Sequence, residues 1–483
     1  MNEEFGYIPR EERKNVLLLC DDIRMHSGIA TMAREFVLGT AHHFNWYNVG
    51  AALKHPEAGK VFDLSEDINK RLNITDASVK VQPNNGYGDA GMVRDLIKRE
   101  KPDAIFIFTD PRYWIWLFDI EREIRSEIPI FWLNIWDDYP TPLYNREYYR
   151  SVDLLMAISK QTKNINEIVL GEEAKDKIIE YVPHGIDEEV FHPISVDSPR
   201  FKELQEFREG LFPEGKDIEF VVFFNSRNIH RKKPADLILA YKMFCDKIGK
   251  EKAAKCALVM HTQPVDSNGT DLIAVKEALC DPEYVNVYFS TNKLDPNQMN
   301  ALYNIADVTA LISSNEGWGL SLTESMMAGT MIIPNISGGM QDQARFTDKE
   351  GKWIDFSPEF PSNHRGTYKD CGEWAIPVFP SNISIAGSPT TPYIFDDRCS
   401  ADDVADAIKQ VYDLPKEERE RRGLAGRTWV TSKESQMSSK NMCKNIARCM
   451  NKAFDNFTPR TAFDLIKVED SKPRAITHAL FDY

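Results

Sequence analysis

Two glutamates, Glu316 and Glu324, lie on either side of a glycine-rich turn in the sequence NEGWGLSLTE. The β-branched apolar run before the turn, VTALISS (308–314), is typical of a buried strand, and the apolar residues after it recur at helical spacing. The turn therefore joins a strand to the start of a helix. Glu324 could simply be an acid in the first turn of a helix. Glu316 is harder to explain, because the start of a helix attracts anions and a second carboxylate there is electrostatically favourable only if it binds the hydroxyl groups of a ligand.

The turn itself resembles an anion site in its composition. Gly317 and Gly319 allow positive φ angles and close approach of a ligand to the backbone. The N–H groups of residues 320–323 open the helix, where the helix dipole favours a negative charge. A phosphate at this point would satisfy both features.

A second group of charges follows another predicted strand, EFVVFFNSR. Arg227 stands at the tip of this strand and Lys232 follows five residues later in a loop. Because ligands bind at the carboxyl ends of parallel strands, these cations and the glycine-rich turn should meet at one sheet edge. Two cations there can neutralise a diphosphate leaving group, although a basic loop can also be merely solvated. The combined pattern predicts a diphosphate between a sugar at Glu316 and a ribose at Glu324.

Composition narrows the class of protein. The chain has 483 residues, of which 42% are hydrophobic, enough for two or three domains. It contains no apolar run of membrane-spanning length, and its first residues, MNEEFGYIPREERKN, are unlike a signal peptide. Eight scattered cysteines indicate reduced thiols and a cytoplasmic protein without a zinc site. The net charge of −15 argues against general nucleic-acid binding, although a local basic groove could survive it.

Short apolar runs alternate with amphipathic segments along most of the chain, which predicts an α/β fold with parallel sheets. The alternation restarts after a Pro- and Gly-containing turn near residue 190. We therefore predict two doubly wound, Rossmann-like domains, 1–190 and 191–430, followed by a C-terminal helix and tail over 431–483. Residues 341–400 interrupt the second domain and are predicted to be a loop-rich insertion.

The sequence GYGDAG (86–91) matches the dinucleotide-binding pattern G-x-G-x-x-G. Such a pattern should follow a strongly apolar strand, but the preceding run SVKVQPNN is a poor buried strand. A permissive turn explains these glycines better than NAD binding does.

Together these motifs resemble the retaining GT-B glycosyltransferases of family GT4. The stretch EGWGLSLTE is similar to the family's E-x₇-E, and SRNIHRKKP stands in place of its usual G-R-x₄-K-G. Three further similarities, VDLLMAISKQT, YVPHGIDEEVFHP and NISGGMQD, occur in the family's order. The resemblance implies two domains facing across a cleft, with C-terminal helices that pack back toward the N-terminal domain.

The same resemblance implies residue roles. The N-terminal domain would bind the acceptor and the second domain the nucleotide-sugar donor, which the resemblance implies is UDP-linked. Arg227 and Lys232 would contact the donor phosphates, Glu316 the transferred sugar and Glu324 the ribose. The other donor-binding residues would be Gly28, Gly317, Trp318, Gly319, Leu320 and Thr323. The implied mechanism is front-face substitution with retention, in which the leaving diphosphate helps to deprotonate the incoming hydroxyl.

Two departures from the family pattern matter. Trp136 and Asp137 stand where many members have His-Asp, so the histidine beside the transferred sugar is missing, and His26 beside Gly28 is a candidate replacement. The chain has no Asp-x-Asp, the carboxylate pattern that holds a divalent metal in the other main glycosyltransferase fold. We therefore expect no metal and no other cofactor, with the cations supplying the positive charge.

The acceptor side is aromatic. The candidates are Trp114, Trp136, Asp137 and Tyr139, together with His26. The rings could be core residues, or they could stack on a flat acceptor such as an extruded base. The chain is also similar to phage-encoded glycosyltransferases, which favours hydroxymethylated pyrimidine in phage DNA as the acceptor, in the host cytoplasm and without membrane insertion. Alternatives are a glycan or small-molecule acceptor, a nucleotide-sugar epimerase, and a non-catalytic binding protein.

Overall fold

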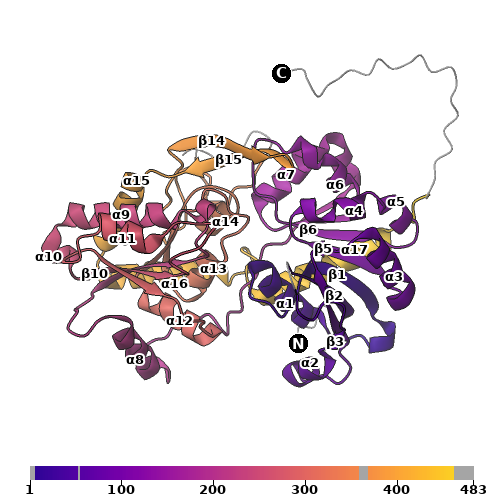
Figure 1. Cartoon of the computed structure of the whole chain (residues 1–483), viewed down its shortest axis with the longest axis horizontal. Helices are drawn as coiled ribbons and strands as arrows, with labels where there is room; N and C mark the ends of the chain where they lie inside the picture. Colours follow the sequence, from indigo (N-terminus) through magenta and orange to yellow (C-terminus); the bar gives the residue numbers. More distant parts are fainter. Residues whose placement is uncertain (1–5, 53–54, 358–367, 462–483) are drawn as a thin grey trace, which may run out of the picture.

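The computed structural model describes residues 6–52, 55–357 and 368–461, which form two α/β domains (Figure 1). The first domain contains the strands from β1 to β8, and the second contains β9 to β13. The ends of the predicted domains at 1–5 and 462–483 lie outside the described residues. The boundary predicted near residue 190 falls in the irregular segment between the last strand of the first domain and the first helix of the second.

The first domain is built on an eight-stranded sheet with the order β3-β4-β2-β1-β5-β6-β7-β8. Every neighbouring pair is parallel except β3 with β4. The strand order reverses between β1 and β5, which is where doubly wound sheets bind ligands. The strands are β1 (Lys14–Asp21), β2 (Phe44–Ala52), β3 (Phe62–Asp63), β4 (Val79–Asn85), β5 (Ala104–Phe108), β6 (Ile130–Asn134), β7 (Leu154–Ala157) and β8 (Ile178–Tyr181).

Helices cover both faces of this sheet, as continuous apolar strands require. Several begin with a polar side chain that accepts a hydrogen bond from the first turn, such as Ser27 and Ser159. The α-helices are α1 (Gly28–Thr40), α2 (Ser65–Leu72), α3 (Ala90–Glu100), α4 (Ile115–Phe118), α5 (Glu121–Ile124), α6 (Arg146–Arg150) and α7 (Lys160–Leu170). Short 3₁₀ turns occur at η1 (Arg10–Glu12), η2 (Pro111–Trp114), η3 (Leu143–Asn145) and η4 (Gly171–Asp176).

The second domain has a five-stranded, all-parallel sheet with the order β11-β10-β9-β12-β13. Its strands are β9 (Phe220–Asn225), β10 (Cys256–His261), β11 (Asn286–Ser290), β12 (Val308–Leu311) and β13 (Met331–Pro334). Its helical elements are α8 (Phe201–Leu211), η5 (His230–Lys232), α9 (Pro234–Ile248), α10 (Lys250–Ala253), α11 (Leu272–Leu279), α12 (Pro296–Ile305) and α13 (Leu320–Met327). Since β9 and β12 are neighbours, the loops after them meet at one sheet edge, as the sequence predicts.

The insertion at 341–400 is more regular than predicted. After α14 (Met340–Ala344), the chain forms an antiparallel hairpin of β14 (Asn382–Ser388) and β15 (Thr391–Arg398). The prediction of an irregular segment is therefore wrong for the hairpin, whose exposed strands lack the apolar pattern by which buried strands are recognised. Residues 358–367 of the predicted insertion lie outside the described residues.

Three helices follow the hairpin: α15 (Ala401–Tyr412), α16 (Lys416–Val430) and α17 (Ser439–Asn456). The last of these lies in the first domain, in yellow among the indigo and purple elements of Figure 1. It packs closely on α1, since a side chain at Gly39 would overlap the Cys443 sulfur. The predicted α/β fold, two domains with C-terminal helices that return to the first, is confirmed.

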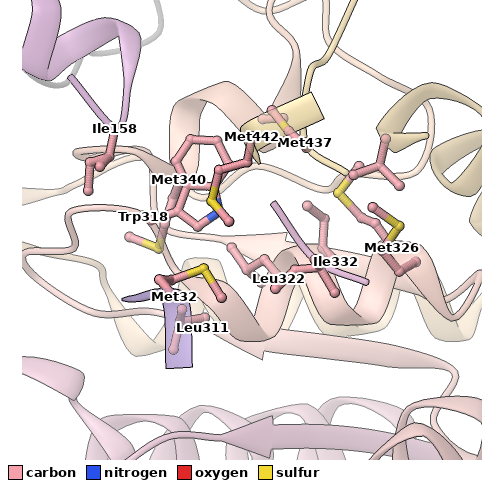
Figure 2. Close-up of a cluster of buried hydrophobic side chains, with 14 of the residues drawn as sticks. Met32, Ile158, Leu311, Trp318, Leu322, Met326, Ile332, Met340, Met437 and Met442 are labelled. Carbon is pink, nitrogen blue, oxygen red and sulfur yellow. The ribbon is translucent and has the colours of Figure 1, made fainter. Parts of the chain in front are cut away.

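One continuous apolar core extends through both domains. Figure 2 shows part of it, in which Met32 of α1 and Met442 of α17 lie near Trp318, Leu322 and Met340 of the second domain. The two domains are thus packed against each other at this point. Within the ranges that the structure describes, none of the helices is long and apolar enough to cross a membrane. All eight cysteines have free thiols.

Candidate active site

Glu316 is the buried centre of a cluster of charges. It lies in the loop between β12 and α13, with 8% of its surface exposed. Its carboxylate forms ion pairs with Lys232 and, at 3.4 Å, with Arg231, both from the turn η5 after β9. Arg231 also donates a hydrogen bond of 2.6 Å to the Asn315 carbonyl oxygen. Two neighbouring strands therefore deliver one acid and two bases to a single point.

The charges in the cluster shift the pKa values of their neighbours. Burial alone would raise the pKa of Glu316, but Lys232 and Arg231 hold it below its ordinary value. Burial lowers the pKa of Lys232 to about 8, although Glu316 favours its charged form. Glu316 is therefore an anion at neutral pH, beside a lysine that is still mostly protonated.

The glycines of this region are required by close contacts. Gly319 has φ +87° and precedes the first residue of α13. A Cβ at Gly317 would lie 2.9 Å from the Ile135 carbonyl oxygen of the first domain. Gly339 donates its N–H to the Glu316 carbonyl oxygen at 3.0 Å, and side chains at Gly338 or Gly339 would overlap this loop. The backbone of the turn is thus held rigidly between the two domains.

Glu324 lies four residues into α13 and is only partly buried. Tyr303 donates a hydrogen bond of 2.5 Å to one of its carboxylate oxygens, and Asn225 at the end of β9 donates to the Tyr303 hydroxyl. Burial raises the pKa of Glu324, while the bond from Tyr303 opposes the rise. The side chain is fixed beside the start of α13, on the same sheet edge as Glu316.

The structure separates two predicted donor residues from this cluster. Arg227, predicted to contact the donor phosphates, is 64% exposed and pairs with Asp266 at 2.9 Å, while the half-exposed Arg231 is the arginine that lies beside Glu316. The Thr323 hydroxyl is buried and accepts hydrogen bonds from Trp318 and Gln343. Side chains of Trp318 and Thr323 therefore serve the packing of the turn, and only their backbone N–H groups are left to meet a donor.

Arg231 was missed in the sequence. It is one of four consecutive residues, HRKK, that are basic or titratable, and spacing alone does not show which of them points inward. The 3₁₀ turn η5 settles this by directing Arg231 and Lys232 to Glu316, while Lys233 pairs with Asp396 in the hairpin.

The first domain contributes Asp137, which follows β6. A Cβ at Gly338 would lie 3.4 Å from the Cβ of Asp137, so this residue adjoins the loop of Glu316. Burial raises the pKa of Asp137 to about 7; Arg231 and Lys232 oppose this rise, and Glu316 adds to it. Asp137 can therefore exchange a proton near neutral pH beside the charged cluster.

The other predicted acceptor-side residues behave differently. Trp114, Trp136 and Tyr139 are buried in the core of the first domain, which favours the alternative that they are core residues over stacking on an acceptor. Burial follows from their place behind the sheet edge, where neighbouring aromatic rings cover them. His26 is exposed, and Gly28 at the start of α1 is near α13, since a Cβ there would lie 3.5 Å from the Leu320 side chain.

Polar contacts tie the two domains together around the cluster. Asn315 donates a hydrogen bond of 2.5 Å to Asp138, and Gln341 donates one of 2.7 Å to Gln161. The β14–β15 hairpin also contacts the first domain, because the Phe395 N–H donates a hydrogen bond of 2.7 Å to the Tyr139 carbonyl oxygen. The carboxyl edges of both sheets thus face each other at Glu316.

A cavity of about 440 Å³ lies at the opposite edge of the first sheet, beside the amino ends of β1 and β2. Its charged residues include Arg10, Arg13 and Lys80. Doubly wound sheets bind ligands at their carboxyl ends, so the charge cluster is the better candidate site. The described part of the chain contains no group of three or more metal-ligating side chains.

The model of the family "Glycosyl transferases group 1" matches residues 206–357, which include Arg231, Lys232, Glu316 and Glu324. This segment is therefore similar to group 1 glycosyltransferase domains. No curated protein matches the sequence.

Similarity to solved structures shows the GT-B fold over most of the chain. HepE of Anabaena, crystallised with UDP and glucose, has a TM-score of 0.61 at 13% identity, over 91% of this chain and 100% of that one. Sucrose-phosphate synthase of Thermosynechococcus elongatus has a TM-score of 0.60 at 14% identity, over 92% and 100%. Trehalose 6-phosphate synthase of Burkholderia multivorans has a TM-score of 0.60 at 10% identity, over 91% and 98%.

Proposed function

We propose that the protein transfers a sugar from a UDP-linked donor to a hydroxyl group, with retention of configuration and without a metal. The observation that carries this proposal is the ion-paired cluster in which the largely buried Glu316 and Lys232 meet the half-exposed Arg231 beside the start of α13, inside the segment that matches the group 1 family. The presence of UDP and glucose in the HepE crystal supports the choice of donor. The free cysteines support a cytoplasmic location.

Each group in the cluster has a chemical task in this proposal. Lys232 and Arg231 stabilise the negative charge that develops on the leaving diphosphate, as do the first N–H groups of α13. Glu316 accepts hydrogen bonds from hydroxyls of the transferred sugar, and Glu324 from the ribose. The leaving diphosphate takes the proton of the incoming hydroxyl on the same face, so no protein nucleophile is needed.

The nature of the acceptor is a separate proposal. Hydroxymethylated pyrimidine in DNA was favoured by the aromatic residues Trp114, Trp136 and Tyr139, but their burial removes the surface that would stack on a base. A glycan or small neutral acceptor therefore fits the site better, and DNA is the alternative to test.

Incubation with a panel of nucleotide sugars tests the reaction. We expect release of UDP and a product that carries one added sugar. NMR of this product should show that the new anomeric bond has the same configuration as in the donor. Isomerised donor without transfer would indicate an epimerase, and donor binding without turnover would indicate a binding protein. Hydroxymethylated DNA belongs among the acceptors, with products identified by mass spectrometry.

Chelation should leave the rate of UDP release unchanged, because Lys232 and Arg231 supply the positive charge that a metal would otherwise provide. The measurement compares initial rates with and without EDTA. A loss of activity that magnesium or manganese restores would contradict the proposed electrostatics.

Donor binding should weaken as the pH rises through about 8, because Lys232 has a pKa of about 8 and loses its charge above that value. Below this pH the ammonium is present and binding is at its plateau. The pH profile of kcat/KM for the donor reports this group in the free enzyme. Lys232→Arg keeps its charge throughout and should remove the alkaline decline, whereas an unchanged decline would assign it to another group.

A further inference from the structure

Two tyrosines stack at the carboxyl edge of the first sheet. Tyr87 follows β4 and Tyr113 lies in η2 after β5, with ring centroids 4.0 Å apart and planes at 17°. Tyr113 is 44% exposed, in contrast to its buried neighbour Trp114. Trp114 packs edge-on against Tyr87 at 5.3 Å and supports the pair from the core. The result is a rigid aromatic surface that faces outward at its Tyr113 side.

The pair is anchored to the region where the strand order reverses. The Tyr87 hydroxyl donates a hydrogen bond of 3.0 Å to Asp21, the last residue of β1. The other oxygen of Asp21 accepts a hydrogen bond of 2.5 Å from Ser27, the residue that caps α1. The next residue, Gly28, faces Leu320 at the start of α13. A short chain of contacts thus connects the aromatic pair to the donor-side helix.

The charges around the pair indicate the chemistry of its ligand. Arg24 is paired with Asp22 at 2.8 Å, and Arg112 is paired with Asp110 at 2.5 Å. Both arginines of these loops are therefore already compensated by a carboxylate, and Arg112 also donates to the hydroxyl of Thr391 in the hairpin. A phosphate would find little unbalanced positive charge here, whereas an uncharged ring with hydroxyl groups would find an aromatic face and the Asp21 carboxylate.

We propose that Tyr113, supported by Tyr87, is the stacking surface for a neutral pyranose ring of the acceptor, with Asp21 at its edge. This inference rests on the proposed function, because the surface lies on the acceptor domain beside α1. Tyr113 is adjacent in the sequence to Trp114, one of the rings for which both core packing and acceptor stacking were open. Asp21 is hydrogen-bonded to Tyr87 and Ser27, so it also fixes the position of the ring.

Binding of maltose, lactose and cellobiose to the UDP-loaded protein, followed by ligand-observed NMR, tests the inference. We expect saturable binding of at least one disaccharide, weakened about 3- to 10-fold by Tyr113→Ala and retained in Tyr113→Phe and Tyr113→Trp. Tyr7→Ala is the matched control, because Tyr7 is 50% exposed and hydrogen-bonded to Asp76 beside the amino ends of the same sheet's strands. This control should bind the disaccharides as the unchanged protein does.

Three results would overturn the inference: no saturable binding of any disaccharide, equal binding by Tyr113→Ala, or preferential binding of an oligonucleotide that contains 5-hydroxymethylcytosine. UDP affinity, measured on the same samples, separates these outcomes from failure of the proposed function. If UDP binds and no sugar does, only the acceptor surface is wrong. If UDP does not bind the unchanged protein, the donor site itself is wrong.

Discussion

Glu316→Gln should lower kcat for sugar transfer by about 10²- to 10³-fold while the protein stays folded. The substitution preserves the size of a side chain that is 8% exposed but removes the negative charge between Lys232 and Arg231. A fixed charge aimed at the reacting centre is worth about 3–4 kcal/mol in the transition state. Measurement of kcat and KM with the donor, alongside thermal unfolding, separates the loss of chemistry from a loss of structure.

Glu123→Gln is the matched control for this experiment. Glu123 also forms an ion pair with an arginine, Arg94 at 2.6 Å, but both side chains are largely exposed and belong to α3 and α5. Exposed pairs contribute about 0–1 kcal/mol, so this variant should keep its activity. Turnover by Glu316→Gln within a few-fold of the unchanged protein would refute the role assigned to Glu316.

The sequence predicted the parts of the site that depend on local structure and sheet order. Glu316 and Lys232 each follow an apolar run that reads as a strand, and the rule that parallel strands share a ligand edge brings them together. The fold was also predictable from local sequence, because the periodicity of apolar residues distinguishes strands from helices and so shows their alternation. Neither prediction needed knowledge of where an individual side chain points.

The sequence does not predict features that depend on side-chain direction. The motif spacing assigns a donor role to Arg227, which pairs with Asp266 in the structure, and it does not indicate that Arg231 lies beside Glu316. Trp114 and Tyr113 are adjacent in the sequence, yet one is buried and the other exposed, because η2 points their rings in different directions. Such choices depend on packing against distant segments, which periodicity does not report.

The contact of Asp137 with the Glu316 loop also depends on packing between segments that are far apart in the sequence. Residues 137 and 316 belong to different domains, and only the packing of the two carboxyl edges brings them together. The apolar core that holds the domains, with Met32 and Met442 beside Trp318, is formed from segments far apart in the chain (Figure 2). A site between domains thus depends on contacts that no single motif contains.

Lys232→Ala should weaken UDP binding by about 30- to 5,000-fold, whereas Arg227→Ala should weaken it by less than about 10-fold. Truncating one partner of a buried charge pair costs about 2–5 kcal/mol, and Lys232 is buried with Glu316. Arg227 is 64% exposed and already paired with Asp266, so its contribution is that of a surface charge, about 0–1 kcal/mol. Isothermal titration with UDP, at a pH below 8 where Lys232 is charged, measures both variants.

The ratio of the two effects distinguishes the structure from the sequence motif. The motif treats Arg227 and Lys232 as equivalent phosphate ligands, so it predicts similar losses from the two variants. The structure places Arg231 beside Glu316 instead, at 3.4 Å and with 46% of its side chain exposed, so Arg231→Ala should weaken UDP binding more than Arg227→Ala and less than Lys232→Ala. If Arg227→Ala weakened UDP binding as much as Lys232→Ala and Arg231→Ala did not, the arginine in the donor site would be Arg227, released from Asp266 when the diphosphate binds.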